Sequence, residues 1–220
     1  MIELIAKAIG LIIDSPFGEA RPFSKERLDE AGMGALKLFA ANGLKPENIV
    51  LRTTDVLFGY ELNFSLFSGS ATFKLSSANL LLNFQNISLQ QELELVSDAV
   101  VKAYSLFEES AFSHHSANMV AHLSFVDEKQ RQGASLSLQD PSRDIEFLGR
   151  LAHLKISDWP WSIRLEIDQS NFFPPGLFMS WMSTWQGRVD TTTLRAVVQA
   201  FLVAATRFEF NIQIPREQRI

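Results

Sequence analysis

Residues 79–107 read NLLLNFQNISLQQELELVSDAVVKAYSLF and change from a strand-like to a helix-like hydrophobic pattern. The first part, 79–85, is typical of a short strand. A helix is predicted from Ser88, because Ser88 and Gln91 have capping-box spacing and apolar residues then recur every three or four positions. The apolar positions of this helix are Leu89, Leu93, Val96, Val100, Tyr104 and Phe107. A strand followed at once by an amphipathic helix favours a mixed fold.

The chain before this stretch predicts a meander of strands preceded by a helix. In the strand at 55–67 the alternate positions Val56, Phe58, Tyr60, Leu62, Phe64 and Leu66 form the expected core face. A hairpin at 68–70 leads into a strand at 71–76. A helix is predicted over 24–42. Residues 1–13 alternate poorly and are interpreted as a strand buried on both faces, with a helix as the alternative.

The chain after this stretch repeats the order of strands, capped helix and strand. Asp190 is the expected cap of the second clear helix, whose apolar residues are Leu194, Val197, Val198, Phe201, Leu202 and Ala205. Strands are predicted at 117–125, 134–138, 151–156, 162–168, 177–185 and 208–214, with a short helix at 140–149. We therefore expect an α+β fold, a mostly antiparallel sheet with amphipathic helices on one face and two structurally similar split-βαβ-like halves. Residues 1–220 are expected to form a single compact domain, with halves at 1–126 and 134–214.

Several kinds of chemistry find no support in the residues. The chain has no cysteine, and none of its four histidines is spaced for shared metal ligation, so no metal and no cofactor are expected. Gly32-Met-Gly34 lies within a helical pattern and lacks the third glycine of a dinucleotide-binding turn. No G-x-S-x-G nucleophile motif is present, so catalytic residues stay unknown and a non-catalytic function is favoured.

The charge pattern bears on partners and on location. The chain has 25 acidic and 20 basic residues, for a net charge of −5, and its arginines are dispersed among acids. Duplex nucleic acid is therefore not expected as a partner, because phosphate binding needs concentrated positive charge. No transmembrane segment and no signal peptide are predicted, so the expected location is cytoplasmic.

The most unusual segment is 159–185, which contains all four tryptophans. Tryptophan, phenylalanine and methionine are enriched in interface cores and in adaptable binding surfaces. The residues predicted to bind a partner or ligand are Trp159, Trp161, Phe173, Phe178, Met179, Trp181, Met182 and Trp185. Covering of this strand on both faces is the structural alternative.

The favoured function is a non-catalytic protein-binding or self-assembly component, with a protein partner or a homo-oligomer. A first alternative is a carrier of an apolar small molecule, with a cavity lined by Trp181, Met179 and Phe201. A second alternative is a hydrolase-like site that uses His114, His115 or His122 with a carboxylate, since scattered residues leave no local motif.

Overall fold

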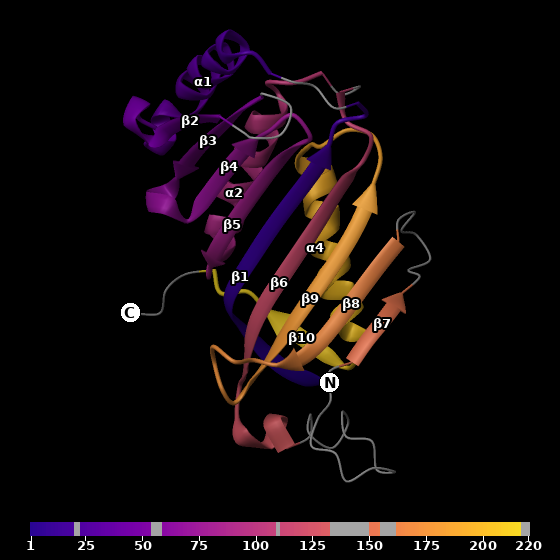
Figure 1. Ribbon diagram of the computed structural model, residues 1–220. Coiled ribbons are helices and arrows are strands. Elements are labelled where there is room, and N and C mark those ends of the chain that lie inside the picture. The colour runs from indigo at the N-terminus through magenta and orange to yellow at the C-terminus, as the bar shows by residue number, and fades with distance from the viewer. Residues whose placement is uncertain (20–22, 54–58, 109–110, 133–149, 155–161, 217–220) are drawn as a thin grey trace.

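The computed structural model describes residues 1–19, 23–53, 59–108, 111–132, 150–154 and 162–216 (Figure 1). The strand expected at 134–138 and the helix expected at 140–149 lie outside these ranges, as does Phe58. The fold is described below for the remaining residues only.

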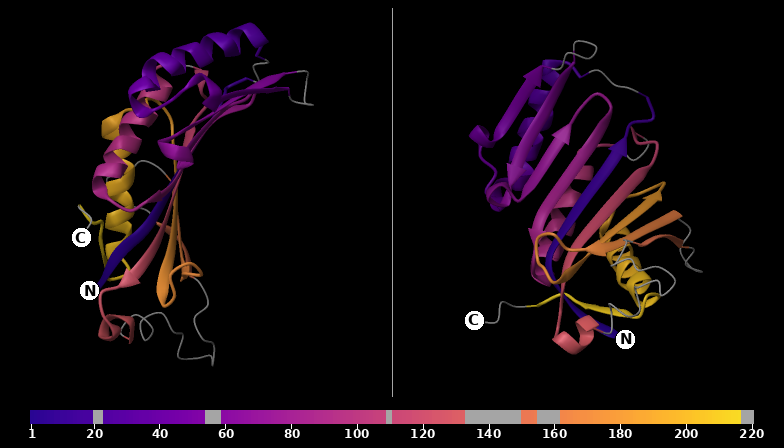
Figure 2. Two further views of the ribbon diagram at one scale, coloured as in Figure 1. Left: turned by 90° about the vertical axis from the view of Figure 1, so that its left-hand side faces the viewer. Right: turned by 60° about the horizontal axis from the view of Figure 1, so that its bottom comes forward.

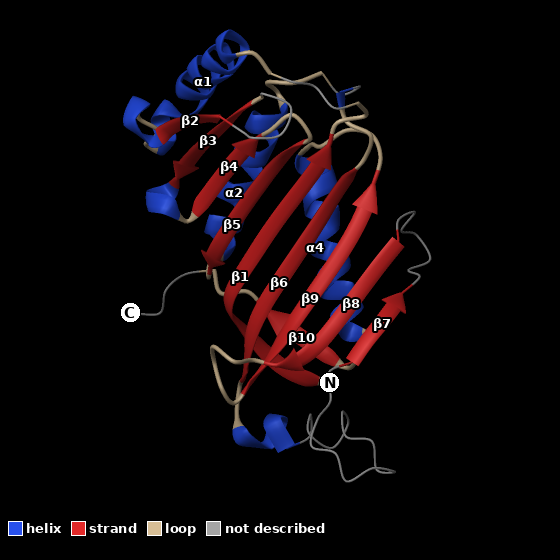
Figure 3. Ribbon diagram, viewed as in Figure 1, coloured by secondary structure: helices blue, strands red, loops and turns tan. Residues whose placement is uncertain are grey.

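Ten strands form one sheet in the order β2-β3-β4-β5-β1-β6-β9-β8-β7, with β10 paired to β1 (Figures 1 and 3). The strands are β1 Ile2–Pro16, β2 Ile49–Thr53, β3 Tyr60–Leu66, β4 Ala71–Leu75, β5 Asn79–Ile87, β6 His115–Phe125, β7 Arg150–Leu154, β8 Ser162–Gln169, β9 Gly176–Trp185 and β10 Phe210–Gln213. All pairings between these strands are antiparallel except that of β1 with β10. The predicted α+β class and mostly antiparallel sheet are confirmed, whereas the division into two similar halves is not.

Three long helices lie on one face of the sheet, and the sheet curves away from them (Figure 2). They are α1 Lys25–Phe39, α2 Gln90–Tyr104 and α4 Thr191–Thr206, and the short 3-10 turns are η1 Ala40–Asn42, η2 Pro46–Asn48 and η3 Phe67–Gly69. Helix α1 contacts β3, α2 contacts β5, and α4 contacts β6 and β10. The opposite face of the sheet, called the open face below, has none of these helices on it. None of the helices in the described ranges is long and apolar enough to span a membrane.

Strand β1 explains why the first residues of the chain alternate poorly. Its buried positions are even-numbered up to Ala6 and odd-numbered from Ile9, because the register with β6 shifts between Ala6 and Ala8. Such a bulge inserts one residue and changes which side chains face the core. The prediction of burial on both faces is wrong, since Lys7 is exposed and Ile12 is only half-buried on the open face.

Two of the three cap residues predicted from the sequence are confirmed. The Ser24 side chain accepts a hydrogen bond from the backbone N–H of Arg27, and Asp190 does the same for Thr193. At α2 the predicted cap is wrong: the helix begins at Gln90, so the cap residue is Leu89 and not Ser88, and the side chain that reaches back is Glu92 and not Gln91. Glu92 Oε2 accepts the backbone N–H groups of Ser88 at 2.7 Å and of Leu89 at 3.0 Å. Glu92 occupies the third helical position, where a carboxylate can reach back to the chain entering the helix.

Large aromatic side chains fill the space between the sheet and the helices. The largest fully buried residues include Trp181, Phe39, Phe73, Phe84, Phe201 and Phe210. The rings of Phe64 and Phe73 stack at 4.7 Å, and Trp181 meets Phe201 of α4 edge-on at 6.4 Å. Trp181 is 0% exposed, so this tryptophan joins β9 to α4 as part of the core.

Replacement of Trp181 should therefore act on stability. Trp181→Ala is expected to lower the free energy of unfolding by about 3–5 kcal/mol, because it leaves a large cavity under α4. Trp181→Phe should cost less, since it keeps most of the ring and removes an indole N–H that has no hydrogen-bond partner among the described residues. Chemical denaturation measures both changes. Met182→Ala is the matched control: Met182 is 41% exposed on the open face, and its loss should cost no more than about 0.5 kcal/mol. Equal losses at positions 181 and 182 would contradict the core assignment.

Candidate functional site

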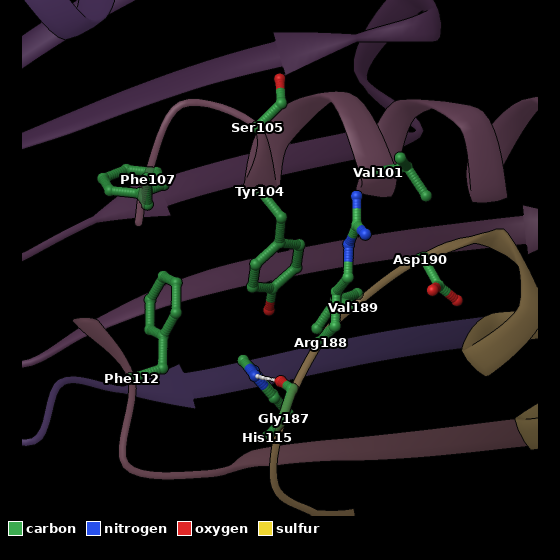
Figure 4. Close-up of a pocket in the computed structure, with 10 residues that line it drawn as sticks. All are labelled: Val101, Tyr104, Ser105, Phe107, Phe112, His115, Gly187, Arg188, Val189 and Asp190. Carbon is green, nitrogen blue, oxygen red and sulfur yellow. Dashed lines mark hydrogen bonds between the residues drawn. The ribbon is translucent and has the colours of Figure 1, made fainter. Parts of the chain in front are cut away.

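A pocket of about 270 Å³ lies between the end of α2, the start of β6 and the segment that joins β9 to α4 (Figure 4). Its lining residues are Val101, Tyr104, Ser105, Phe107, Phe112, His115, Gly187, Arg188, Val189 and Asp190. These residues come from three separate parts of the chain, and the sheet topology brings β6 and β9 side by side. The pocket combines apolar walls with a small number of polar groups, which is typical of small-molecule sites.

Aromatic rings form one side of the pocket. Phe107 follows the last turn of α2, and its ring lies 5.8 Å from that of Phe112. The Tyr104 ring meets Phe112 edge-on at 5.4 Å. Edge-to-face packing of this kind fixes the rings relative to one another and leaves flat apolar surface for a ligand.

The opposite side is the short segment 186–190, whose backbone is fixed at three points. Gly187 has φ +95°, a left-handed conformation that favours glycine. Its carbonyl accepts a hydrogen bond from Nε2 of His115 at 2.8 Å. The Thr193 hydroxyl lies 3.2 Å from the Arg188 carbonyl and 3.1 Å from Asp190 Oδ1 and shares its one hydrogen between them, and Asp190 caps α4. The segment therefore presents the Arg188 side chain from a fixed backbone.

Arg188 supplies the positive charge of the pocket. Its side chain extends from the β9–α4 segment beside the Tyr104 ring (Figure 4). Among the described residues, no carboxylate lies within 4.0 Å of its guanidinium group. Asp190 Oδ1 accepts hydrogen bonds from both the backbone N–H and the hydroxyl of Thr193. The Thr193 backbone hydrogen bond is the main reason that the pKa of Asp190 is lowered, so this carboxylate is held by the start of α4.

A buried polar network forms the floor of the pocket. Ser15, near the end of β1, is hydrogen-bonded through Oγ to the hydroxyl of Tyr104 and, at 2.7 Å, to Nδ1 of His115. The other ring nitrogen of His115 is the one bonded to Gly187. A carbonyl only accepts, so Nε2 carries the hydrogen, and in the neutral ring Nδ1 is the acceptor for Ser15. Both nitrogens of His115 are thus used.

Burial sets the protonation states of this network. Desolvation lowers the pKa of His115, and the nearby His114 lowers it further, while the hydrogen bond to Gly187 acts in the opposite direction. Burial also raises the pKa of Tyr104, so its hydroxyl stays protonated. The ring of His115 lies 5.4 Å from those of Tyr104 and Phe112 and 5.5 Å from that of Trp185. An imidazolium ion in this aromatic surrounding would be poorly solvated, which favours the neutral ring.

The residues predicted from the sequence as a binding surface are divided by the structure. Met179, Trp181 and Trp185 face the helices and are buried in the core. Phe178 and Met182 of β9 lie on the open face. Phe173 lies in the segment between β8 and β9 and is 40% exposed. Trp159 and Trp161 lie outside the described residues.

Phe173 and Phe178 meet at His122 on the open face. Their rings lie 6.0 Å and 5.2 Å from the His122 ring, and Phe172, which is 76% exposed, lies 4.9 Å from it. His122 Nδ1 is 3.0 Å from the hydroxyl oxygen of Ser170. A role for Phe173, Phe178 and Met182 in binding stays a prediction.

The three histidines named for hydrolysis are not gathered in one place. His114 is hydrogen-bonded to Ser113, His115 lies in the pocket floor, and His122 lies on the open face. Among the described residues, none of the three is hydrogen-bonded to a carboxylate. No group of three His, Asp or Glu side chains in those residues is placed to hold a metal ion.

Sequence reasoning missed most of the pocket. The sequence pattern places Tyr104 and Phe107 on the apolar side of the helix predicted from Ser88. Nothing in the neighbouring sequence links them to Ser15 or Arg188. The one usable signal was the pair Gly187 and Asp190, a turn residue followed by a helix cap. It indicates an ordered segment at that point without indicating what faces it.

Comparisons with known proteins identify no family for this chain. No family model and no curated protein matches its sequence. Among solved structures, the chain is similar to a rolling circle replication initiator protein from Geobacillus stearothermophilus, with 9% sequence identity and a TM-score of 0.37. The match covers 99% of this chain and 89% of that one.

The prediction of a protein-binding or self-assembly component is wrong. Trp181 and Trp185, on which the prediction depended, are buried core residues and not part of an exposed binding surface. The alternatives are corrected as well. Met179, Trp181 and Phe201 are packed in the core, with Trp181 against Phe201, so they do not line the predicted carrier cavity. Among the described residues, none of the histidines of the predicted hydrolase site is hydrogen-bonded to a carboxylate, and His122 lies away from the other two.

Acidification should destabilise the protein through His115. An unfolded histidine titrates near pH 6.5, and the pKa of His115 is lowered in the folded protein. Below about pH 6.5 the unfolded chain therefore binds more protons, and the free energy of unfolding falls as the pH falls toward the folded pKa. Urea denaturation between pH 5 and 8 measures this slope. His115→Gln should reduce the slope strongly, and His114→Gln should reduce it only slightly, because His114 is the smallest contribution to the lowered pKa of His115. His122, whose pKa is also lowered by burial, accounts for a remaining part. An unaltered slope in His115→Gln would refute this assignment.

Proposed function

We propose that the protein binds a small planar organic acid, a single flat ring with one carboxylate, in the pocket between α2, β6 and α4. The observation that carries this proposal is the guanidinium group of Arg188, which forms no salt bridge with a carboxylate among the described residues and lines the same pocket as three aromatic rings. A flat ring suits the aromatic side of the pocket, and a carboxylate suits the arginine.

The charge argument favours an anion over a neutral ligand. A guanidinium group presents two parallel N–H donors that match the two oxygens of a carboxylate. Asp190 also lines the pocket, but its Oδ1 is engaged by Thr193 and its charge is stabilised by the start of α4. Arg188 attracts the Asp190 carboxylate and helps to lower its pKa, but the two form no salt bridge, so the guanidinium N–H donors stay available to a ligand.

The size argument favours a small ligand. Pockets for drug-sized molecules measure about 300–1,000 Å³, and this one measures about 270 Å³. A molecule that consists of a single ring with one acidic group fits a pocket of this volume. The fixed backbone at Gly187 and Arg188 supports binding, because little conformational entropy is lost when the ligand enters.

This proposal concerns a small molecule and adds two predictions about the setting in which it acts. Duplex nucleic acid is not expected as a partner, since the net charge is −5 and the arginines are dispersed. A cytoplasmic location is likewise a prediction from the sequence.

Titration calorimetry with benzoate, a single ring with one carboxylate, tests the proposed function at pH 7. Wild-type protein should bind benzoate, and Arg188→Met should weaken the binding by about tenfold or more, because a hydrogen-bonded charge contributes about 1.5–3 kcal/mol. Benzamide, which has the same shape without the charge, should bind the wild type more weakly than benzoate does.

Arg207→Met is the matched control for this experiment. Arg207 is an exposed arginine that follows the last residue of α4, at the opposite end of that helix from the pocket. It should leave benzoate binding unchanged. The proposal is wrong if the wild type does not bind benzoate, or if the two arginine variants bind it equally well.

A further inference from the structure

The hydrogen bonds beneath the pocket form a chain with a defined direction. Because Nε2 of His115 donates to the Gly187 carbonyl, Nδ1 of the neutral ring accepts, and the Ser15 hydroxyl must donate to it. Ser15 has only one hydrogen, so the hydroxyl of Tyr104 must donate to Ser15. In this state the hydrogen of the Tyr104 hydroxyl points away from the pocket and toward β1.

Protonation of His115 would reverse this chain. Nδ1 then carries a hydrogen and donates to Ser15, and the Ser15 hydrogen turns to the oxygen of Tyr104. The hydrogen of the Tyr104 hydroxyl is displaced and needs another acceptor. Tyr104 lines the pocket, so an acceptor in the pocket can take that hydrogen. The proton added to His115 is balanced by no loss elsewhere in the network, which therefore gains one positive charge.

An anion in the pocket would satisfy both changes at once. Its oxygen would accept the hydrogen released by Tyr104, and its negative charge would offset that of the imidazolium ion. A bound carboxylate would also offset the charge of Arg188, which lines the same pocket as His115.

Few other charged groups face His115 from the elements around it. Asp14 of β1 is hydrogen-bonded to Asn79 at 2.6 Å, and Asp190 is held by the start of α4. His114 precedes β6 and disfavours the charged ring. On α2, Lys102 is paired with Asp98 at 2.8 Å. Arg188 attracts the Asp190 carboxylate, so His115 is the group in this floor whose protonation can respond to a ligand.

We infer that binding of an organic anion in this pocket is coupled to uptake of a proton by His115, with the Tyr104 hydroxyl turning from Ser15 to the ligand carboxylate. This inference rests on the proposed function and adds its regulation: the affinity rises as the pH falls. The step conserves atoms, since one proton from solvent enters at Nδ1 and two hydroxyl hydrogens change partners.

Calorimetry of benzoate binding at pH 7 in phosphate and in Tris tests the coupling with the wild-type protein alone. The two buffers differ in ionisation enthalpy, so the difference in observed heat gives the number of protons taken up. We expect up to about one proton per benzoate, and an affinity that rises up to about tenfold per pH unit between pH 8 and 6. Carboxylates of this kind titrate near pH 4, so the probe stays ionised throughout.

Two variants assign the effect to residues. His115→Gln offers a donor and an acceptor without a titrating group, and should abolish proton uptake. His122→Gln, at a histidine on the open face, is the matched control and should keep it. Tyr104→Phe removes the hydroxyl that turns to the ligand, and should weaken benzoate binding most at low pH. Benzoate binding with no proton uptake and no change in affinity from pH 8 to 6 would overturn the coupling and leave the proposed function intact. Absence of benzoate binding would overturn both.

Discussion

The pairing of β1 on both of its edges is the constraint on which the rest of the structure depends. One edge pairs with β6 along most of its length, and the other pairs with β10 at Ile2–Ile5 and with β5 from Ile9 onward. The bulge near Lys7 sets which residues of the second part face the helices. A slip of one residue would turn Ile9 and Ile13 out of the core and would move Ser15 out of reach of His115.

The parts of the fold that could be predicted are those specified by neighbouring residues. Strands β3 to β5 and helices α1, α2 and α4 follow from local periodicity and caps, and the alternation along β9 correctly separates Met179, Trp181 and Trp185 from Phe178 and Met182. Local pattern does not indicate which face the helices cover. For this reason five apolar residues of β9 suggest a binding surface, although three of them belong to the core.

The pocket could not be predicted, for a related reason. Its polar floor joins Ser15, Tyr104 and His115 through contacts that span 89 and 100 residues of sequence. Each residue alone has an ordinary role, as a strand end, a helix residue or a strand start. Only the topology, with β1 between β5 and β6 and with α2 packed on β5, makes them neighbours (Figure 3).

The floor of the pocket also shows how polar groups are accommodated within an aromatic core. Ser15 and His115 are both buried, and the hydrogen bonds of the network satisfy the Ser15 hydroxyl and both ring nitrogens of His115. An incomplete network would cost stability at each unpaired group. Because both ring nitrogens are hydrogen-bonded, the tautomer of His115 is fixed. The bond to the Gly187 carbonyl also fixes the position of the segment that carries Arg188.

The parallel pairing of β1 with β10 has a consequence for how the chain folds. Ile2 lies opposite Phe210, so β1 is synthesised first and waits for a neighbour that is made some two hundred residues later. Until then one edge of an apolar strand lacks its partner along four residues, and contacts so distant in sequence form slowly. The nascent protein therefore depends on early pairing of β1 with β5 and β6 to protect that strand from other chains.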